Sequence, residues 1–329
     1  MILTRAPLRI PLGGGGTDLP SYYSQYGGFV LSAAINRYVY ISINRPQVDE
    51  LIRIKYSKSE TVEDLNEIQH ELVREAMRLT GVERGVEIVS MADVPAGTGM
   101  GSSGSFLVAL LRALHAYRRE HIPPSQLAEE ACRIEIDMVG SPVGKQDQYI
   151  AALGGLTSLD IAPDGEVSAI RLPMSTHHLD ELRGNLLLFY TGIQRRSLDI
   201  LEDQRRDTAQ VREDVIDSLH QTRRLGLEIK AALEAGDLNR FGELLDVHWQ
   251  NKKRRSGKIS DPRIDRWYEI ARDHGALGGK LMGAGGGGFF LLYCPNNHKG
   301  QLREAMAGEG LREMPFDFDF EGAKVMVDF

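Results

Sequence analysis

Cysteine is scarce in this chain of 329 residues, which contains Cys132 and Cys294 and no other. Two cysteines in apolar runs of different type do not predict a disulfide framework and indicate a reducing compartment such as the cytoplasm. The first residues, Met1 to Arg5, lack a charged segment followed by an apolar one, so they do not predict a signal peptide. We therefore expect a cytoplasmic protein that folds without disulfide bonds.

Long apolar runs and an excess of basic charge are also missing. No run approaches the ~20 apolar residues of a membrane span, which argues against a membrane protein. The formal net charge is −7, which argues against a nucleic-acid partner, because such proteins present a basic face. An anionic substrate would need a local basic pocket inside this acidic chain.

Glycine, by contrast, is abundant at 35 residues, with three clusters at 13–16, 97–104 and 278–288. Clustered glycine allows positive φ and close approach of the main chain to a ligand. The pattern of apolar residues between turn signals predicts an α+β protein of two domains, 1–165 and 166–329, divided near Pro163-Asp164-Gly165. We expect strands at 3–12, 28–33, 38–44, 51–56, 86–91, 157–161, 186–191, 288–293 and 324–328, and helices at 64–79, 106–117, 124–138, 199–235, 238–253 and 262–274.

The second glycine cluster has the sequence context of an anion site. Residues 93–105 read Asp-Val-Pro-Ala-Gly-Thr-Gly-Met-Gly-Ser-Ser-Gly-Ser, between a predicted strand and an apolar helix that Ser102 or Ser103 would cap. Successive main-chain N–H groups and the helix N-terminus favour a phosphate there. The pattern is neither a Walker loop nor a dinucleotide fingerprint, because it lacks Gly-Lys-Ser/Thr and the G-x-G-x-x-G spacing.

This loop resembles the second motif of the galactokinase, homoserine kinase, mevalonate kinase and phosphomevalonate kinase (GHMP) superfamily. Residues 6–18 and 280–289 resemble its first and third motifs, in matching order along essentially the whole chain. The resemblance implies a two-domain GHMP kinase fold, with a ribosomal protein S5 domain 2-like N-terminal domain and a ferredoxin-like α+β C-terminal domain. Gly-Gly-Gly-Gly-Thr-Asp-Leu-Pro, Gly-Lys-Gln-Asp-Gln-Tyr and Gly-Gly-Lys-Leu-Met-Gly are most similar to the D-glycero-D-manno-heptose 7-phosphate kinase branch.

The resemblance also implies roles for individual residues. Taken alone, Asp147 would be a solvated loop aspartate, but it matches the superfamily's catalytic aspartate and is expected to accept the proton of the sugar hydroxyl, with Gln146 as its alternative. Arg9 would assist electrostatically. Ser103 and Glu135 would hold Mg²⁺, with Asp137 a weaker candidate. The ATP cradle would consist of Pro95, Gly97, Gly99, Gly101, Ser102, Ser103 and Gly104.

The sugar is expected to contact the first and third motifs and a basic site. The expected contacts are Asp18, Gly16, Thr17, Gly285, Gly286 and Arg195. Further basic candidates for a substrate phosphate are Arg196, Lys145 and Lys55, whereas the run Lys252 to Arg255 is interpreted as a solvated helix end and His248-Trp249 as core.

The predicted function is an ATP- and Mg²⁺-dependent sugar kinase that phosphorylates the anomeric hydroxyl of heptose 7-phosphate to heptose 1,7-bisphosphate, on the route to GDP-heptose. An L-fucose- or galactose-type sugar-1-kinase is the alternative, although galactokinases have Gly-Glu-His where this chain has glycines. Two alternatives belong to other functional classes. One is a catalytically silent protein that senses sugar and nucleotide, and the other is a decarboxylase on the same scaffold. The presence of Asp147, Arg9 and the complete loop favours an enzyme. A homodimer is compatible with the sequence, which does not determine the oligomeric state.

Overall fold

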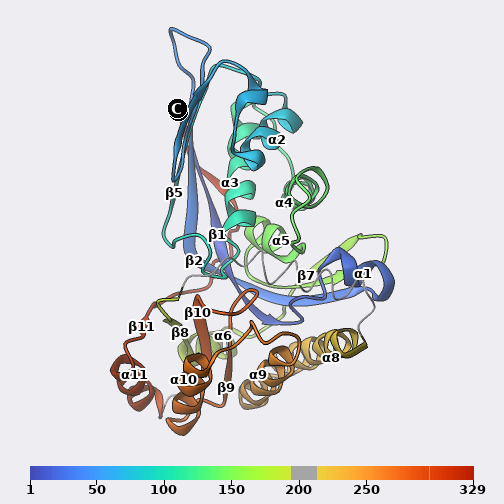
Figure 1. Ribbon diagram of the computed structural model, residues 1–329, viewed down its shortest axis with the longest axis vertical. Helices are drawn as coiled ribbons and strands as arrows, with labels where there is room; N and C mark the ends of the chain where they lie inside the picture. The colour runs from blue at the N-terminus through green and yellow to red at the C-terminus, as the bar shows by residue number, and fades with distance from the viewer. Residues whose placement is uncertain (194–212, 296) are drawn as a thin grey trace.

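The computed structural model describes residues 1–193, 213–295 and 297–329, which form a large and a small β-sheet with helices packed on both (Figure 1). The large sheet has the order β12-β1-β2-β5-β3-β4, with β6 paired to β2 and β7 to β6. Strand β3 runs parallel to β5, and the other pairs are antiparallel. The strands are β1 Ile2–Gly13, β2 Gly28–Asn44, β3 Ile52–Lys55, β4 Ser59–Val62, β5 Val86–Ala92, β6 Leu156–Ile161, β7 Val167–Arg171 and β12 Lys324–Asp328.

The small sheet has the order β11-β8-β10-β9, all antiparallel. Its strands are β8 Leu186–Tyr190, β9 Gly278–Leu281, β10 Phe289–Tyr293 and β11 Arg312–Glu313. The described helices are α1 Pro20–Tyr26, the 3₁₀ helix Leu65–Glu67, α2 Glu71–Thr80, α3 Ser102–Tyr117, α4 Pro124–Cys132, the π-helix Arg133–Met138, α5 Gln146–Leu153, α6 Thr176–Asn185, α8 Glu213–Glu234, α9 Leu238–Lys253, α10 Pro262–Asp273 and α11 Lys299–Gly308. None of these helices is both long and apolar enough to span a bilayer.

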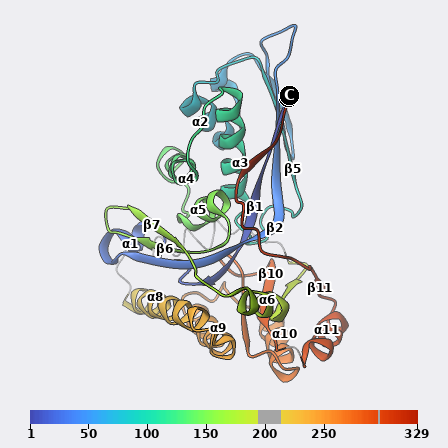
Figure 2. The same ribbon diagram turned by 180° about the vertical axis from the view of Figure 1, so that it is seen from behind.

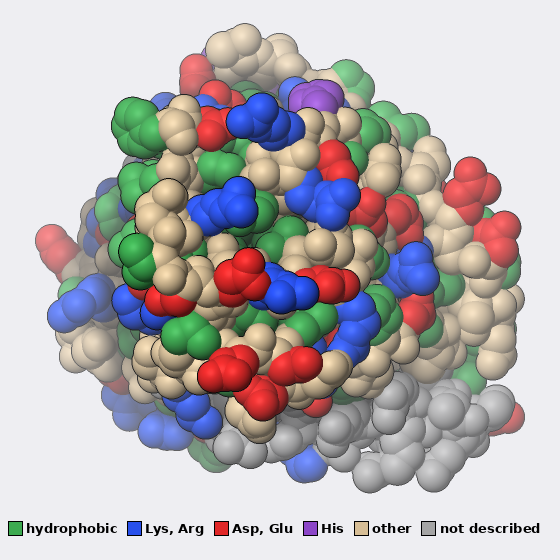
Figure 3. All heavy atoms as spheres, turned by 90° about the horizontal axis from the view of Figure 1, so that it is seen from above, with side chains coloured by type: hydrophobic (Ala, Val, Ile, Leu, Met, Phe, Trp, Pro, Cys, Tyr) green, Lys and Arg blue, Asp and Glu red, His purple; other side chains and the backbone are tan. Residues whose placement is uncertain are grey.

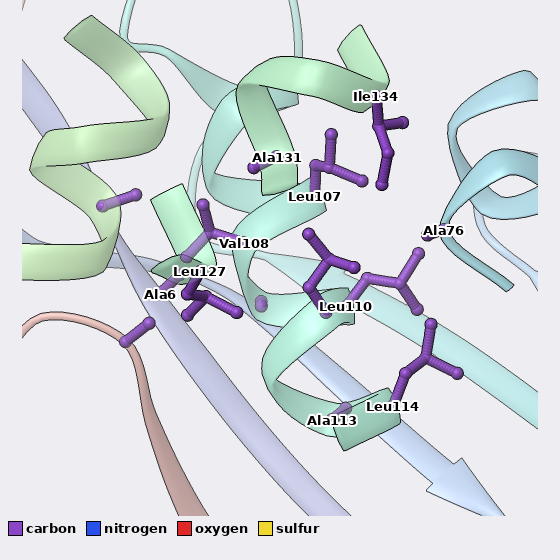
Figure 4. Close-up of a cluster of buried hydrophobic side chains, with 14 of the residues drawn as sticks. Ala6, Ala76, Leu107, Val108, Leu110, Ala113, Leu114, Leu127, Ala131 and Ile134 are labelled. Carbon is purple, nitrogen blue, oxygen red and sulfur yellow. The ribbon is translucent and has the colours of Figure 1, made fainter. Parts of the chain in front are cut away.

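Two apolar cores hold the layers together. The first lies between the large sheet and the helices α2 to α5, and Figure 4 shows Leu107, Leu110 and Leu114 of α3 directed into it. The second joins Leu8 and Ile10 of β1 to residues of α8, α9 and the small sheet. Figures 1 and 2 both place α8 and α9 directly below the lower end of the large sheet. The two halves of the chain therefore share a continuous apolar interface, which fixes the position of one against the other.

Several predicted elements differ from the observed ones. Segments 28–33 and 38–44 form the single strand β2, because a register shift in its pairing with β1 absorbs the polar residues between them. The predicted helix 64–79 is divided into the 3₁₀ helix and α2, which ends at Gly81 in the left-handed conformation as its C-cap. Asp147 lies in the first turn of α5 rather than in a loop. The part of the predicted helix 199–235 before residue 213 lies outside the described residues.

The last strand returns to the first sheet. Strand β12 pairs with β1, and the N-terminal amine of Met1 donates to the carbonyl of Phe329 at 3.3 Å. Strand β7 also belongs to the large sheet, although it follows residue 165. The domain division at 165 stays a prediction.

Charged side chains of both signs alternate over the face in Figure 3, without a continuous basic area on that face. The described residues of this face therefore offer no continuous basic area for an anionic substrate. Several basic side chains are buried in the interior instead, among them Lys252, Arg255 and Lys280.

Candidate active site

The loop between β5 and α3 has the conformation of an anion-binding nest. Gly97, Gly99 and Gly101 all have positive φ, at 79°, 79° and 76°, and alternate with residues of ordinary conformation. Such alternation turns successive main-chain N–H groups toward one side, where they bind phosphate oxygens. Gly101 is also the N-cap of α3, so the prediction that Ser102 or Ser103 caps this helix is wrong. Both serines instead lie in the first turn, where their hydroxyls are free for other contacts.

An ion pair joins this loop to the first motif. The Arg9 Nε atom donates to Asp147 Oδ1 at 2.7 Å, and Arg9 Nη1 donates to the carbonyl of Gly99 at 2.6 Å. The Arg9 side chain is 5% exposed and that of Asp147 is 20% exposed, so one carboxylate oxygen of Asp147 remains accessible. This arrangement can position a proton acceptor next to a phosphate nest, with a cation between them.

Gly101 and Gly104 make room for Asp147 because glycine has no side chain. A Cβ added at Gly104 would lie 2.7 Å from Asp147 Cβ, and one added at Gly101 would lie 3.0 Å from Asp147 Cγ. Glycine at these positions therefore lets α3 and α5 approach closely enough to set Asp147 against the loop.

Glu135 and Ser103 meet on the other side of α3. Ser103 Oγ donates to Glu135 Oε1 at 2.6 Å, and Gln148 Nε2 donates to Glu135 Oε2 at 2.7 Å. Glu135 is 3% exposed, and burial raises the pKa of its carboxyl group. It lies in the π-helix, a distortion that is frequent at functional sites. The exposed Asp137 points elsewhere, and no contact of it with Ser103 is found among the described residues.

These residues fit a magnesium ion bound mainly by substrate. Among the described residues there is no cluster of three or more His, Cys, Asp or Glu side chains that could form an all-protein metal cage. One carboxylate and one or two hydroxyls suffice for Mg²⁺, which usually keeps water and phosphate oxygens as further ligands. The buried Ser102 Oγ has no hydrogen-bond partner among the described residues and could serve such a ligand.

The first motif contributes Asp18. Its Oδ1 accepts from the Gly16 N–H at 3.0 Å, and its Oδ2 accepts from the Gln146 N–H at 3.2 Å. Burial raises the pKa of Asp18, which is 1% exposed. Thr17 has a packing role, because its fully buried hydroxyl bonds to the main chain of Gly14 and Phe29. The predicted substrate contact of Thr17 therefore does not involve its side chain.

A cavity connects Asp18 with the Asp147–Arg9 pair. It is lined by Arg9, Pro11, Gly15, Gly16, Asp18, Leu19, Val143, Gly144, Gln146, Asp147, His248, Lys252, Arg255, Ile259, Lys280, Gly283 and Ala284. Gln146 and Asp147 both line it, but only Asp147 pairs with Arg9, whereas Gln146 bonds to Asp18 and Ser32. The third glycine motif contributes Gly283 and Ala284 rather than the predicted Gly285 and Gly286, which pack against Ile259.

The third motif also touches the loop between β5 and α3. A Cβ added at Gly283 would lie 2.6 Å from Gly99 Cα, and one added at Gly288 would lie 2.2 Å from the Thr98 carbonyl oxygen. The two loops are thus in main-chain contact, which brings both halves of the chain to one site.

The interpretation of Lys252 to Arg255 as a solvated helix end is wrong for its first and last residues. Lys252 is 8% exposed and Arg255 is 7% exposed, and both line the cavity. Lys252 lies in the last turn of α9 and Arg255 in the turn that continues it, so these residues, three apart, lie on one face, while Lys253 is partly exposed and Arg254 is exposed. His248, one turn earlier, is buried as predicted but also lines the cavity, and Trp249 is core.

The other basic side chains predicted as candidates for binding a substrate phosphate do not line the cavity in the described parts of the chain. Lys145 donates to Glu129 and to the carbonyl of Gly165, and Lys55 pairs with Glu87. Arg195 and Arg196 lie outside the described residues. Lys280, which lies within the third motif, lines the cavity although it was not predicted as a site residue. A lysine in an otherwise apolar and glycine-rich strand is the signal that indicates it.

The buried position of Lys252 predicts a pH-dependent stability. Burial, together with the neighbouring Arg255 and Arg9, lowers the pKa of Lys252 from 10.5 to about 7. Between these values the unfolded chain binds more protons than the folded one, so stability rises with pH. The stability that the neutral form of Lys252 provides is fully present above pH 10.5 and is lost as the pH falls through about 7. Relative to Lys252→Met, the wild-type free energy of unfolding should rise by up to about 1.4 kcal/mol per pH unit in this window.

Urea unfolding between pH 7 and 10 measures this difference. The control is Lys253→Met, because the partly exposed Lys253 pairs with Asp265 and should leave the pH dependence unchanged. Parallel curves for the wild type and Lys252→Met would contradict the prediction.

Comparisons with known proteins agree with this geometry. The model of the GHMP kinases N terminal domain matches residues 66–155 and that of the GHMP kinases C terminal domain matches 229–311, together more than half of the chain. D-glycero-alpha-D-manno-heptose 7-phosphate kinase of Campylobacter jejuni subsp. jejuni is 28% identical, over 98% of each chain. L-fucokinase/L-fucose-1-P guanylyltransferase of Bacteroides fragilis is 25% identical over 88% of this chain but 34% of that protein.

Solved structures resemble the whole chain. A D-glycero-D-manno-heptose 1-phosphate kinase from Bacteriodes thetaiotaomicron has a TM-score of 0.83 and 25% identity, covering 100% of both chains. A putative sugar kinase from Campylobacter jejuni has a TM-score of 0.79 and 27% identity, covering 98% of this chain and 97% of that one. The matched domains, the shared architecture and the three glycine loops lead to one conclusion: the chain belongs to the GHMP kinases.

Proposed function

We propose that this kinase transfers the γ-phosphoryl group of ATP to the anomeric hydroxyl of D-glycero-D-manno-heptose 7-phosphate, giving heptose 1,7-bisphosphate for the synthesis of a nucleotide-activated heptose. The observation that carries the proposal is the Asp147–Arg9 pair, set between the phosphate nest and the cavity. The name of the Campylobacter relative, similar over nearly its full length, supports the choice of sugar.

The proposed step is a direct in-line transfer. The anomeric oxygen attacks the γ-phosphorus, its proton passes to the free carboxylate oxygen of Asp147, and the bond from the γ-phosphorus to the bridging oxygen breaks to release ADP. Arg9 offsets negative charge on the transferred group while it holds Asp147 in place. Main-chain N–H groups of residues 97–104 hold the triphosphate, and Asp18 orients the sugar hydroxyls. Magnesium, bound through Glu135 and Ser103, would supply further charge neutralisation.

A substitution at Gly144 tests the role of Asp18. A Cβ at Gly144 would lie 2.1 Å from Asp18 Oδ2, so the carboxylate would have to turn away from its present position. Loss of a hydrogen bond to a charged group costs about 1.5–3 kcal/mol, so Gly144→Ala should raise the sugar KM about 10- to 100-fold with little change in the ATP KM. Gly300→Ala is the control, since a Cβ there meets nothing within 4 Å. A variant whose sugar KM stays at the wild-type value would refute this role.

The proposal is tested by ADP release with Mg-ATP over a panel of acceptors. The panel holds heptose 7-phosphate, heptose 1-phosphate, L-fucose, galactose and mevalonate. Turnover confined to heptose 7-phosphate is the expected result. Turnover on a free hexose would support a sugar kinase but reject heptose 7-phosphate as its substrate. Tight nucleotide binding without turnover on any acceptor would favour a sensor.

A further inference from the structure

The end of the cavity formed by the C-terminal half is basic. Lys252 and Arg255 at the end of α9 and Lys280 of β9 line it, with exposed fractions of 8%, 7% and 2%. Together with Arg9 they bring four basic side chains, each a cation when protonated, to the cavity, against the two carboxylates Asp18 and Asp147. Asp147 already pairs with Arg9.

The three C-terminal cations have only neutral partners. Lys280 Nζ donates to the Leu12 carbonyl at 3.1 Å. Arg255 donates to the Gly15 carbonyl at 3.3 Å, to Ser218 Oγ at 3.2 Å and to Thr222 Oγ1. Lys252 Nζ donates to the carbonyls of Leu281 and Gly283. In the described parts of the chain, none of the three has a carboxylate within ion-pairing distance.

Such a cluster is unfavourable without an anion. Buried charges are normally paired, and like charges that share a low-dielectric site repel one another. The pKa of Lys280 is accordingly well below its ordinary value, because of burial and of Lys252, Arg255 and Arg9. Each cation also keeps unused N–H groups, since an ammonium has three donors and a guanidinium five. His248, 2% exposed, has no partner for either ring nitrogen among the described residues and lines the same cavity.

We propose that Arg255 and Lys280 bind the phosphate group that the sugar already carries, with His248 beside them. This inference rests on the proposed function and gives its substrate class a physical basis, because a dianionic phosphate monoester compensates the unpaired cations and a neutral sugar does not. Lys252 lies toward the nucleotide, since its partner Gly283 is packed on Gly99 of the phosphate nest.

The test compares heptose 7-phosphate with the same heptose lacking its phosphate, at saturating ATP. The wild type should prefer the phosphorylated sugar in kcat/KM by about 100-fold or more. In Lys280→Met and in Arg255→Met this preference should fall about 30-fold or more, while the ATP KM changes less than about twofold. Arg254→Met is the matched control, because this exposed cation neighbours Arg255 on the outer face. Equal losses with both sugars, or a wild type that does not discriminate between them, would overturn the proposal.

A binding measurement separates this inference from the identity of the sugar. The melting temperature is measured as a function of the inorganic phosphate concentration, while a non-hydrolysable ATP analogue saturates the nucleotide site. The wild type and Arg254→Met should be stabilised by phosphate, and the two site variants should melt cooperatively without that stabilisation. If heptose 7-phosphate is no substrate but phosphate still stabilises the wild type through these residues, the sugar assignment fails and the site stands. No phosphate effect on the wild type rejects the site.

Discussion

Asp147→Asn should lower kcat by about 10³-fold or more and leave the ATP KM within a few-fold of the wild type. Asparagine has nearly the shape of aspartate, so it fits the space that Gly101 and Gly104 leave, and its oxygen can still accept from Arg9. It cannot take the proton of the acceptor hydroxyl, and general base catalysis contributes about 10²–10⁴-fold. Loss of the charge beside Arg9 adds to the effect.

Steady-state ADP release measures this loss, and nucleotide binding to the variant shows that the loop is intact. Asp164→Asn is the control, since Asp164 is an exposed turn residue that accepts from the N–H of Glu166. A variant that keeps more than a tenth of the wild-type kcat would exclude Asp147 as the base, and Gln146, which points to Asp18, could not replace it in that role.

Glu135→Gln should lower kcat/KM for Mg-ATP by about 10²–10³-fold and raise the half-saturating magnesium concentration. Glutamine keeps the length of the side chain and can still bond to Ser103 and Gln148, so the fold around α3 should persist. What it loses is the negative charge, and a metal ion that neutralises a transferring phosphoryl group contributes several kcal/mol to catalysis. Because burial raises the pKa of Glu135, the neutral substitute should not lower the stability of the unliganded protein.

Magnesium titration of activity is the decisive measurement here. Activity of Glu135→Gln should recover in part at high Mg²⁺ or with Mn²⁺, which a purely structural role of the side chain would not produce. Asp137→Asn, an exposed carboxylate two residues away, should behave as the wild type. An unchanged magnesium dependence in Glu135→Gln would remove this residue from the proposed metal site.

Both halves of the chain are required for the site. Arg9 belongs to β1, Asp18 to the turn after it, Asp147 to α5 and Glu135 to the π-helix. Lys252 belongs to α9, Arg255 to the turn after it and Lys280 to β9. Main-chain contact between Gly99 and Gly283 joins the two groups. Phosphoryl transfer depends on positioning and charge neutralisation rather than on covalent chemistry, so a site of this kind needs such a rigid junction.

The parts of the site that depend on local conformation could be predicted from the sequence. Glycine permits the positive φ of Gly97, Gly99 and Gly101 without steric cost, and a strand, a glycine loop and an apolar helix in that order suffice to predict a phosphate nest. Periodicity likewise located α9, and the three glycine motifs led to the family. These features depend on neighbours within a few residues, which a sequence displays directly.

Which charged side chains face the cavity depends on long-range packing and could not be predicted from the sequence. Lys252 and Arg255 stand in a run of four basic residues whose sequence is that of a solvated helix end, and Lys280 stands in a short strand without a partner nearby in the chain. Lys280 and Arg255 donate to the carbonyls of Leu12 in β1 and of Gly15 in the turn after it, across more than 200 residues of sequence. Contacts at that separation are fixed by the packing of the two sheets and not by local preference, whereas Asp147 meets Arg9 through the packing of α5 on β1 and α3.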